Sequence, residues 1–264
     1  MTVGPALLLA AKLALVLGVV LAASLVARRF GHAAGGLLAG MPVIAGPITG
    51  LLLIDLPALD VRAVCLATLA CQPALIAYLL CFAHAAQRWR WPASLGAALA
   101  LFFACSAVLL QLPLPEWGRI ALAVAAPVLG LRAMPTAARG GHGGPVTLPR
   151  IELAWRAGVA LVVAAGVLWG AQHLSTGLAG LLLAAPIAGT VLPAFTSQRH
   201  GGAATAGLLA GFVRGQVGFV SFFVVMLFVL ARWPAAVAWA TAMLASALLP
   251  WLVAQRRARV LPRR

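Results

Sequence analysis

The chain consists of long apolar runs separated by short gaps that carry most of its arginines. A membrane-spanning helix requires about 20 consecutive, mostly apolar residues. Runs of this kind recur along the whole sequence, in which 64% of the residues are hydrophobic and 9% are charged. Because a helix satisfies its own backbone hydrogen bonds inside a bilayer, the sequence predicts an all-α, polytopic membrane protein.

Reading the apolar runs at this length predicts nine transmembrane helices. Their expected bounds are 5–27, 35–54, 61–86, 92–113, 119–134, 151–172, 176–197, 203–231 and 234–254. The fifth helix is the weakest of these, because Pro127 and Arg132 shorten its apolar run.

The basic residues predict how these helices are oriented. With nine spans, one side collects Arg28, Arg29, Arg88, Arg90, Arg132, Arg139, Arg150, Arg199, Arg256, Arg257, Arg259, Arg263 and Arg264. The other side has Arg62, Arg119 and Arg232. Since Lys and Arg accumulate on the cytoplasmic side, we expect a periplasmic N-terminus and a cytoplasmic C-terminus. The basic residues thus indicate orientation, whereas a nucleic-acid partner would require them to cluster on a soluble face.

The expected location is the inner membrane of a bacterium. Arginine far outnumbers lysine, and alanine, glycine and proline are abundant. This composition is typical of GC-rich bacterial genes.

An offset of 144 residues relates two parts of the chain. It pairs Gly36, Leu37, Leu38, Pro42, Gln72, Arg88 and Trp89 with Gly180, Leu181, Leu182, Pro186, Gln216, Arg232 and Trp233. Five spans separate equivalent helices, so the two copies would have opposite orientations in the membrane. The expected organisation is a first repeat at 1–113, a linking helix and Gly-rich loop at 114–150, and a second repeat with a basic tail at 151–264. Inverted repeats with interrupted helices are a hallmark of secondary transporters.

The second and seventh spans, 35–54 and 176–197, are the richest in Gly and Pro. Broken backbone at membrane depth is tolerated where it is buried in protein or lines a cavity. We therefore expect both helices to be broken, close to a substrate site. The alternative is a pair of kinked helices that pack closely through glycine, with no cavity.

Polar and helix-breaking residues within the spans mark the expected substrate site. They are Arg214, Gln72, Gln216, Thr68, Ser221, Pro42, Gly46, Thr49, Pro186, Gly189 and Thr190. Arg214 leads this group, because a cation inside an apolar run is costly and usually faces protein or water. At helical spacing it shares a face with Gly207, Gly211, Gly218 and Ser221, and a stripe of small residues is expected to face inward. The alternatives are a snorkelling arginine and, for the glutamines, hydrogen bonds that merely join helices.

Catalytic and cofactor chemistry finds little support in the sequence. The acids are all at or beside span ends, and they are Asp55, Asp60, Glu116 and Glu152. The cysteines and histidines lack the spacing of metal ligands. We therefore expect a permease without a cofactor or a metal, and not an enzyme.

The expected substrate is a small solute that is anionic or rich in hydrogen-bond acceptors. Lys12, Arg156 and Arg214 are cations inside spans with no carboxylate near the midplane, and an anion would relieve the cost of burying such a charge. The partners would be this solute and membrane lipids. Two competing classes remain open, which are a lipid flippase for an anionic headgroup and a non-transporting scaffold.

Reporter fusions test the predicted topology. Fusions after Arg90, Arg139 and Arg264 should give cytoplasmic signals, and a fusion after Arg119 should give a periplasmic signal. If the fusions after Arg119 and Arg139 reported the same side, the fifth span and the inverted repeat would both be wrong.

Overall fold

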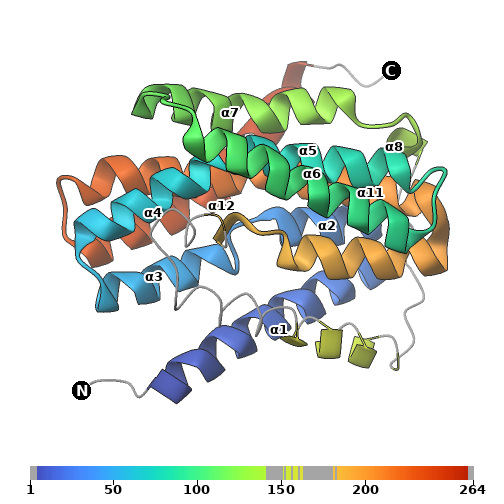
Figure 1. The fold of residues 1–264 in the computed structure, drawn as a ribbon, viewed down its shortest axis with the longest axis horizontal. Helices are drawn as coiled ribbons and strands as arrows, with labels where there is room; N and C mark the ends of the chain where they lie inside the picture. The colour runs from blue at the N-terminus through green and yellow to red at the C-terminus, as the bar shows by residue number, and fades with distance from the viewer. Residues whose placement is uncertain are drawn as a thin grey trace.

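The computed structural model describes residues 5–140, 151, 153–155, 157–159, 161–162, 181 and 183–260, and every regular element in these ranges is a helix. The helices pack side by side into one bundle (Figure 1). Their bounds are α1 Pro5–Phe30, α2 His32–Gly40, α3 Ala45–Asp55, α4 Ala58–Ala70, α5 Gln72–Ala85, α6 Trp91–Gln111, α7 Glu116–Ala133, α8 Ala137–Gly140, α11 Ile187–Leu230 and α12 Ala235–Val260.

Several of these helices are suited to a membrane. Four segments of the described chain are long and apolar enough to cross one, namely His32–Ile54, Ala58–Ala85, Trp91–Gln111 and Ile187–Leu230. Ala235–Leu249 is a shorter apolar helix. The protein is therefore an all-helical chain with several membrane-compatible helices. Most of the predicted span 151–172 and the start of the span 176–197 lie outside the described residues.

Two of the expected spans agree closely with described helices, and two others differ in their bounds. α6 and α7 begin and end within three residues of the expected bounds. The span expected at 61–86 is interrupted at Cys71, because Pro73 has no N–H to donate to Leu69 and the helix restarts there as α5. The last helix continues to Val260, beyond the expected end at residue 254.

The predicted interruptions in the two Gly/Pro-rich spans are confirmed. Met41 has an extended backbone with φ −74° and ψ 163°, and it separates α2 from α3. In the second half, Ala185 and Pro186 are non-helical and α11 begins at Ile187. Both interruptions coincide with the prolines that the sequence comparison had paired, Pro42 and Pro186.

Two glycines turn the chain sharply at one end of the bundle. Gly31 has φ 88° and Gly201 has φ 78°, a backbone conformation that other residues adopt only with strain. Gly31 joins α1 to α2, and at Gly201 the chain of α11 reverses its direction (Figure 1). The rings of the adjacent His32 and His200 are 4.8 Å apart between centroids, so the two corners lie side by side.

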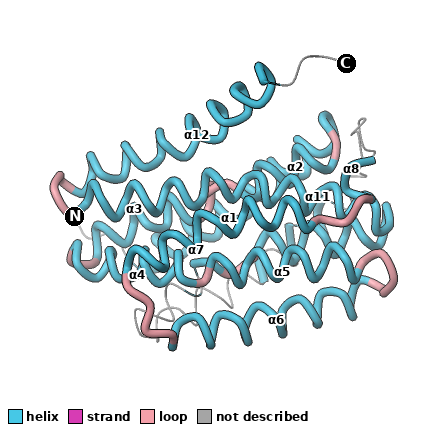
Figure 2. Tube along the Cα trace, turned by 90° about the horizontal axis from the view of Figure 1, so that it is seen from above, coloured by secondary structure: helices cyan, strands magenta, loops and turns pink. Residues whose placement is uncertain are grey.

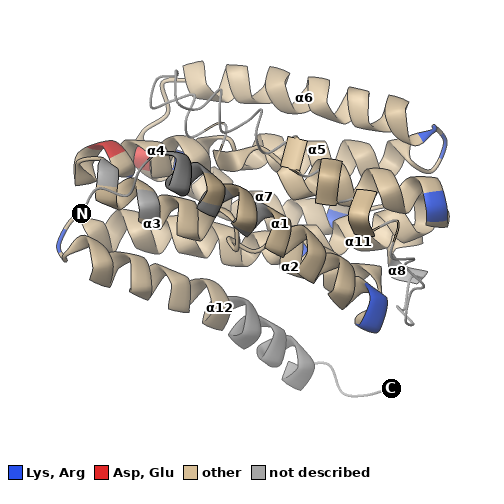
Figure 3. Cartoon of the chain, turned by 90° about the horizontal axis from the view of Figure 1, so that it is seen from below, with Lys and Arg blue, Asp and Glu red and all other residues tan. Residues whose placement is uncertain are grey.

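Charged residues separate between the two ends of the bundle. Figure 3 shows Lys and Arg mainly at the end with the two corners and the α5–α6 loop, and acidic residues at the opposite end. At that opposite end, Arg62 of α4 forms an ion pair with Glu116 at the start of α7. The grouping agrees with the predicted sides, and its orientation in the membrane stays a prediction.

The closest helix packing joins α2 to the part of α11 that follows Gly201. A Cβ atom at Gly36 would overlap the carbonyl oxygen of Leu208, and one at Gly40 would overlap that of Phe212. Conversely, a Cβ at Gly211 would overlap the carbonyl oxygen of Ala33. Small residues on both helices therefore allow backbone-to-backbone contact. Figure 2 shows α6 and α12 at opposite edges of the bundle, with these helices between them.

Substitution of Gly211 tests this packing. We expect Gly211→Ala to lower the free energy of unfolding by about 1–3 kcal/mol, because the added methyl group overpacks the α2 contact. Gly207→Ala, one turn earlier, is the matched control, because a Cβ there meets no atom within 4 Å. Unfolding in detergent should show a neutral or slightly stabilised control. Equal losses in the two variants would contradict the contact.

Candidate functional site

Three interruptions of helical backbone meet one stretch of α11. They lie after Gly40, at Cys71 and at Ala185–Pro186. The carbonyl group of Phe212 contacts Gly40, and its ring lies 3.6 Å from the Cβ position of Gly189, shortly after the third interruption. Phe212 thus lies between the broken stretches of the two halves.

Two buried glutamines form the polar centre of this region. Gln72 is 0% exposed and Gln216 is 2% exposed. The Nε2 of Gln72 donates to Oε1 of Gln216 at 2.9 Å, and the Nε2 of Gln216 donates to the carbonyl oxygen of Gly40 at 3.0 Å. Gly40 is the last residue of α2, where a carbonyl has no donor from its own helix. The amide pair therefore completes the broken end of α2.

The direction of this hydrogen-bond chain is determined by its last acceptor. A carbonyl oxygen accepts and cannot donate, so Gln216 must turn its Nε2 toward Gly40. Its Oε1 then faces Gln72, which must donate in turn. The Oε1 of Gln72 is left buried with no hydrogen-bond partner. Buried polar atoms without a partner are rare and costly.

The carbonyl group of Gly189 is freed by a proline and bonded by a tyrosine. Pro193 stands four residues later and has no N–H to donate to Gly189. The hydroxyl group of Tyr78 on α5 donates to this carbonyl oxygen at 2.8 Å. Tyr78 is 0% exposed, so the bond lies in the interior.

Gly46 in the first half has a similar arrangement. The Nε1 of Trp239 on α12 donates to its carbonyl oxygen at 2.8 Å. Gly46 and Gly189 occupy corresponding places in the two Gly/Pro-rich stretches. Each broken stretch is therefore held by an aromatic donor from the other half of the chain.

The four predicted hydroxyl groups bond to their own helices. Thr49 donates to Ala45, Thr68 to Val64, Thr190 to Ile187 and Ser221 to Val217, at 2.7–2.8 Å from the hydroxyl to the backbone oxygen. Pro42, Gly46, Pro186 and Gly189 are buried, at or shortly after the two interruptions that contain the paired prolines. These residues shape the region, and the amide pair is its distinctive polar feature.

Arg214 does not join this group. Its side chain is exposed, whereas Gln216 two residues later is buried on another face of α11. The predicted stripe that placed Arg214 with Gly207, Gly211 and Gly218 is wrong in this respect, because these glycines are buried. Binding of an anionic substrate by Arg214 stays a prediction. Because Arg214 lies on another face of α11 than Gln216, it would not act together with the amide pair.

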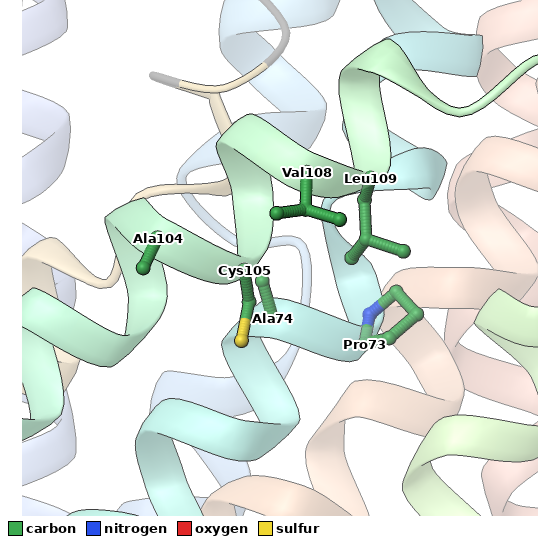
Figure 4. A pocket seen from close by; sticks show the side chains of 6 residues that line it. All are labelled: Pro73, Ala74, Ala104, Cys105, Val108 and Leu109. Carbon is green, nitrogen blue, oxygen red and sulfur yellow. The ribbon is translucent and has the colours of Figure 1, made fainter.

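A groove lies on the other side of α5, against α6 (Figure 4). Its volume is about 430 Å³, and its lining consists of Pro73, Ala74, Ala104, Cys105, Val108 and Leu109. Neither glutamine lines it, and its walls are apolar. It therefore does not extend the polar centre.

Two residues of the site were missed by the sequence analysis. Tyr78 is the single tyrosine of the chain and lies inside an apolar run, which was a signal that it needs a partner. Trp239 lies inside the predicted span 234–254, where its indole N–H also needs an acceptor. In both cases the sequence shows a hydrogen-bond donor inside an apolar run. The acceptors, Gly189 and Gly46, are identified only by the folded structure.

No family, no curated protein and no solved structure matches the chain. Among the described residues, no group of three or more His, Cys, Asp or Glu could hold a metal ion. The interpretation of the site therefore rests on its own geometry.

A double substitution tests the link between Tyr78 and Gly189. We expect Tyr78→Phe to destabilise the protein by about 1–3 kcal/mol, because it leaves a buried carbonyl group unpaired. Pro193→Ala restores a backbone N–H four residues after Gly189. In that background Tyr78→Phe should cost much less, as measured by unfolding in detergent. An equal cost in both backgrounds would contradict the assigned bond.

Proposed function

We propose that this protein is a carrier that moves a small polar solute across the bacterial inner membrane, and that it is not an enzyme. It would be built from two inverted repeats of four helices, 1–113 and 151–264, joined by the segment 114–150. The solute site would lie at the Gln72–Gln216 pair, between the broken helices of the two repeats. Secondary transporters place their sites at such positions.

The hydrogen bond between Gln72 and Gln216 is the observation that carries this proposal. The two residues are 144 positions apart, which is the offset of the predicted repeat. Two residues related by a two-fold axis contact each other only close to that axis. If the repeats are related by such an axis, the direct contact of these equivalent glutamines places them beside it.

The interrupted helices provide a second line of support. Continuous helices resist bending, whereas a break in the backbone hydrogen bonds gives a place where two segments can move. The interruptions surround the amide pair, so such movements would expose it.

Lipid handling is a second candidate, and Arg214 favours it. The part of α11 that follows the corner at Gly201 begins at Gly202 and ends at Leu230. The exposed Arg214 lies roughly 18 Å along this segment from Gly202, and therefore near its middle. A cation at this depth on an outer face is costly unless it meets an anion or water. A passing phosphate headgroup would provide the anion.

Thiol labelling tests the carrier without knowledge of its substrate. In a background with Cys65, Cys71, Cys81 and Cys105 changed to alanine, we would introduce Thr49→Cys and Thr190→Cys separately. Alternating access predicts that a membrane-impermeant maleimide labels each cysteine from either side of oriented vesicles.

Thr241→Cys is the matched control, because Thr241 is exposed on α12, a helix that carries neither glutamine. It should remain unlabelled from both sides if that face meets lipid. Failure to label Thr49→Cys and Thr190→Cys from either side would indicate a scaffold. Labelling from one side alone would contradict alternating access.

A further inference from the structure

The hydrogen bonds around Gln72 leave one acceptor without a donor. Gln72 Oε1 is buried and has no partner, while Nε2 of the same amide is used by Gln216. Turning the Gln72 amide over would set its oxygen against the oxygen of Gln216. Turning the Gln216 amide over would set an oxygen against the carbonyl group of Gly40. The unpaired acceptor is therefore a consequence of the residues present, and not of how the amides are assigned.

We propose that Gln72 Oε1 recognises the transported solute, and that this solute is small, uncharged and provides an O–H or N–H donor. The proposal rests on the carrier function proposed above. It names the substrate class of the same site. A donor from the solute would add the one hydrogen bond that the resting site lacks, without displacing any existing one.

An uncharged solute follows from the charges around the site. Among the described acidic residues, Asp60 lies in the first turn of α4, at the opposite end of that helix from Cys71, and Glu116 is already paired with Arg62. A cation at the amide pair would therefore have no counter-charge in a low-dielectric interior. An anion would face the oxygens of Gln72 and Gly40, while Arg214 is on another face of its helix.

Access to the acceptor requires a local separation of helices. Gln72 is 0% exposed and is the first residue of α5, directly after the interruption at Cys71. Gly40, which holds the other end of the amide chain, directly precedes the interruption after α2. A movement at these two places would open the amide pair without breaking regular helix.

Solute flux into proteoliposomes tests the substrate class. Stopped-flow light scattering would compare urea and glycerol, which are uncharged donors, with trimethylamine N-oxide, which is a net-neutral acceptor without a donor, and with acetate, which is an anion. We expect the purified protein to accelerate the flux of urea or glycerol above that of protein-free vesicles. Trimethylamine N-oxide and acetate should show no acceleration.

Substitutions of Gln72 connect the flux to its oxygen. Gln72→Met has a similar length and no polar atom, and it should reduce the donor-solute flux by about tenfold or more. Gln72→Glu in its neutral form can still donate to Gln216 and keep a free oxygen, so it should retain the preference for donors. Gln87→Met, in the α5–α6 loop, is the matched control and should leave the flux unchanged. If Gln72→Met does not fold, two measurements decide the test. They are the preference of Gln72→Glu for donor solutes and the selectivity of the wild-type protein among the four solutes.

Several outcomes would overturn the proposal. These are equal flux of urea and trimethylamine N-oxide, acceleration of acetate alone, wild-type flux in folded Gln72→Met, or phospholipid scrambling without solute flux. If the thiol labelling shows access from both sides, such a result rejects the substrate class and leaves the carrier. If that labelling fails as well, the carrier is rejected too.

Discussion

Every backbone carbonyl group inside the hydrocarbon core of a membrane needs a hydrogen-bond donor from the protein, because lipid tails provide none. This constraint explains the contacts at the centre of the molecule. Where α2 ends, Gln216 donates to Gly40, and where Pro193 removes a backbone donor, Tyr78 donates to Gly189. The broken helices are possible because side chains on neighbouring helices supply these donors.

The same constraint separates what the sequence could predict from what it could not. The helices and their ends follow from long apolar runs, and α6 and α7 appear close to their expected positions. The breaks near Pro42 and Pro186 follow from residues that cannot continue a helix. The interruption at Cys71 was missed, although Pro73 provided a local signal for it.

The candidate site was predicted in part. The shared offset of Gln72 and Gln216 indicated facing positions, and their direct hydrogen bond agrees with this. Arg214 was assigned to the same site because it shares a helical face with small residues. Such a face is wide, and the sequence does not show whether a residue at its margin is buried or exposed. Its exposure depends on the rotation of α11 against α2, which the glycine contacts determine. Tertiary packing of this kind cannot be deduced from one helix alone.

The donors that complete the broken stretches all come from the opposite half of the chain. Trp239 bonds to Gly46 and Gln216 bonds to Gly40, while Tyr78 reaches forward to Gly189. During synthesis the first half therefore enters the membrane long before its donors exist. Its open carbonyl groups must meanwhile bond to water, to lipid headgroups or to the insertion machinery. The ordering of the broken first half is thus coupled to the emergence of α11 and α12, which carry Gln216 and Trp239.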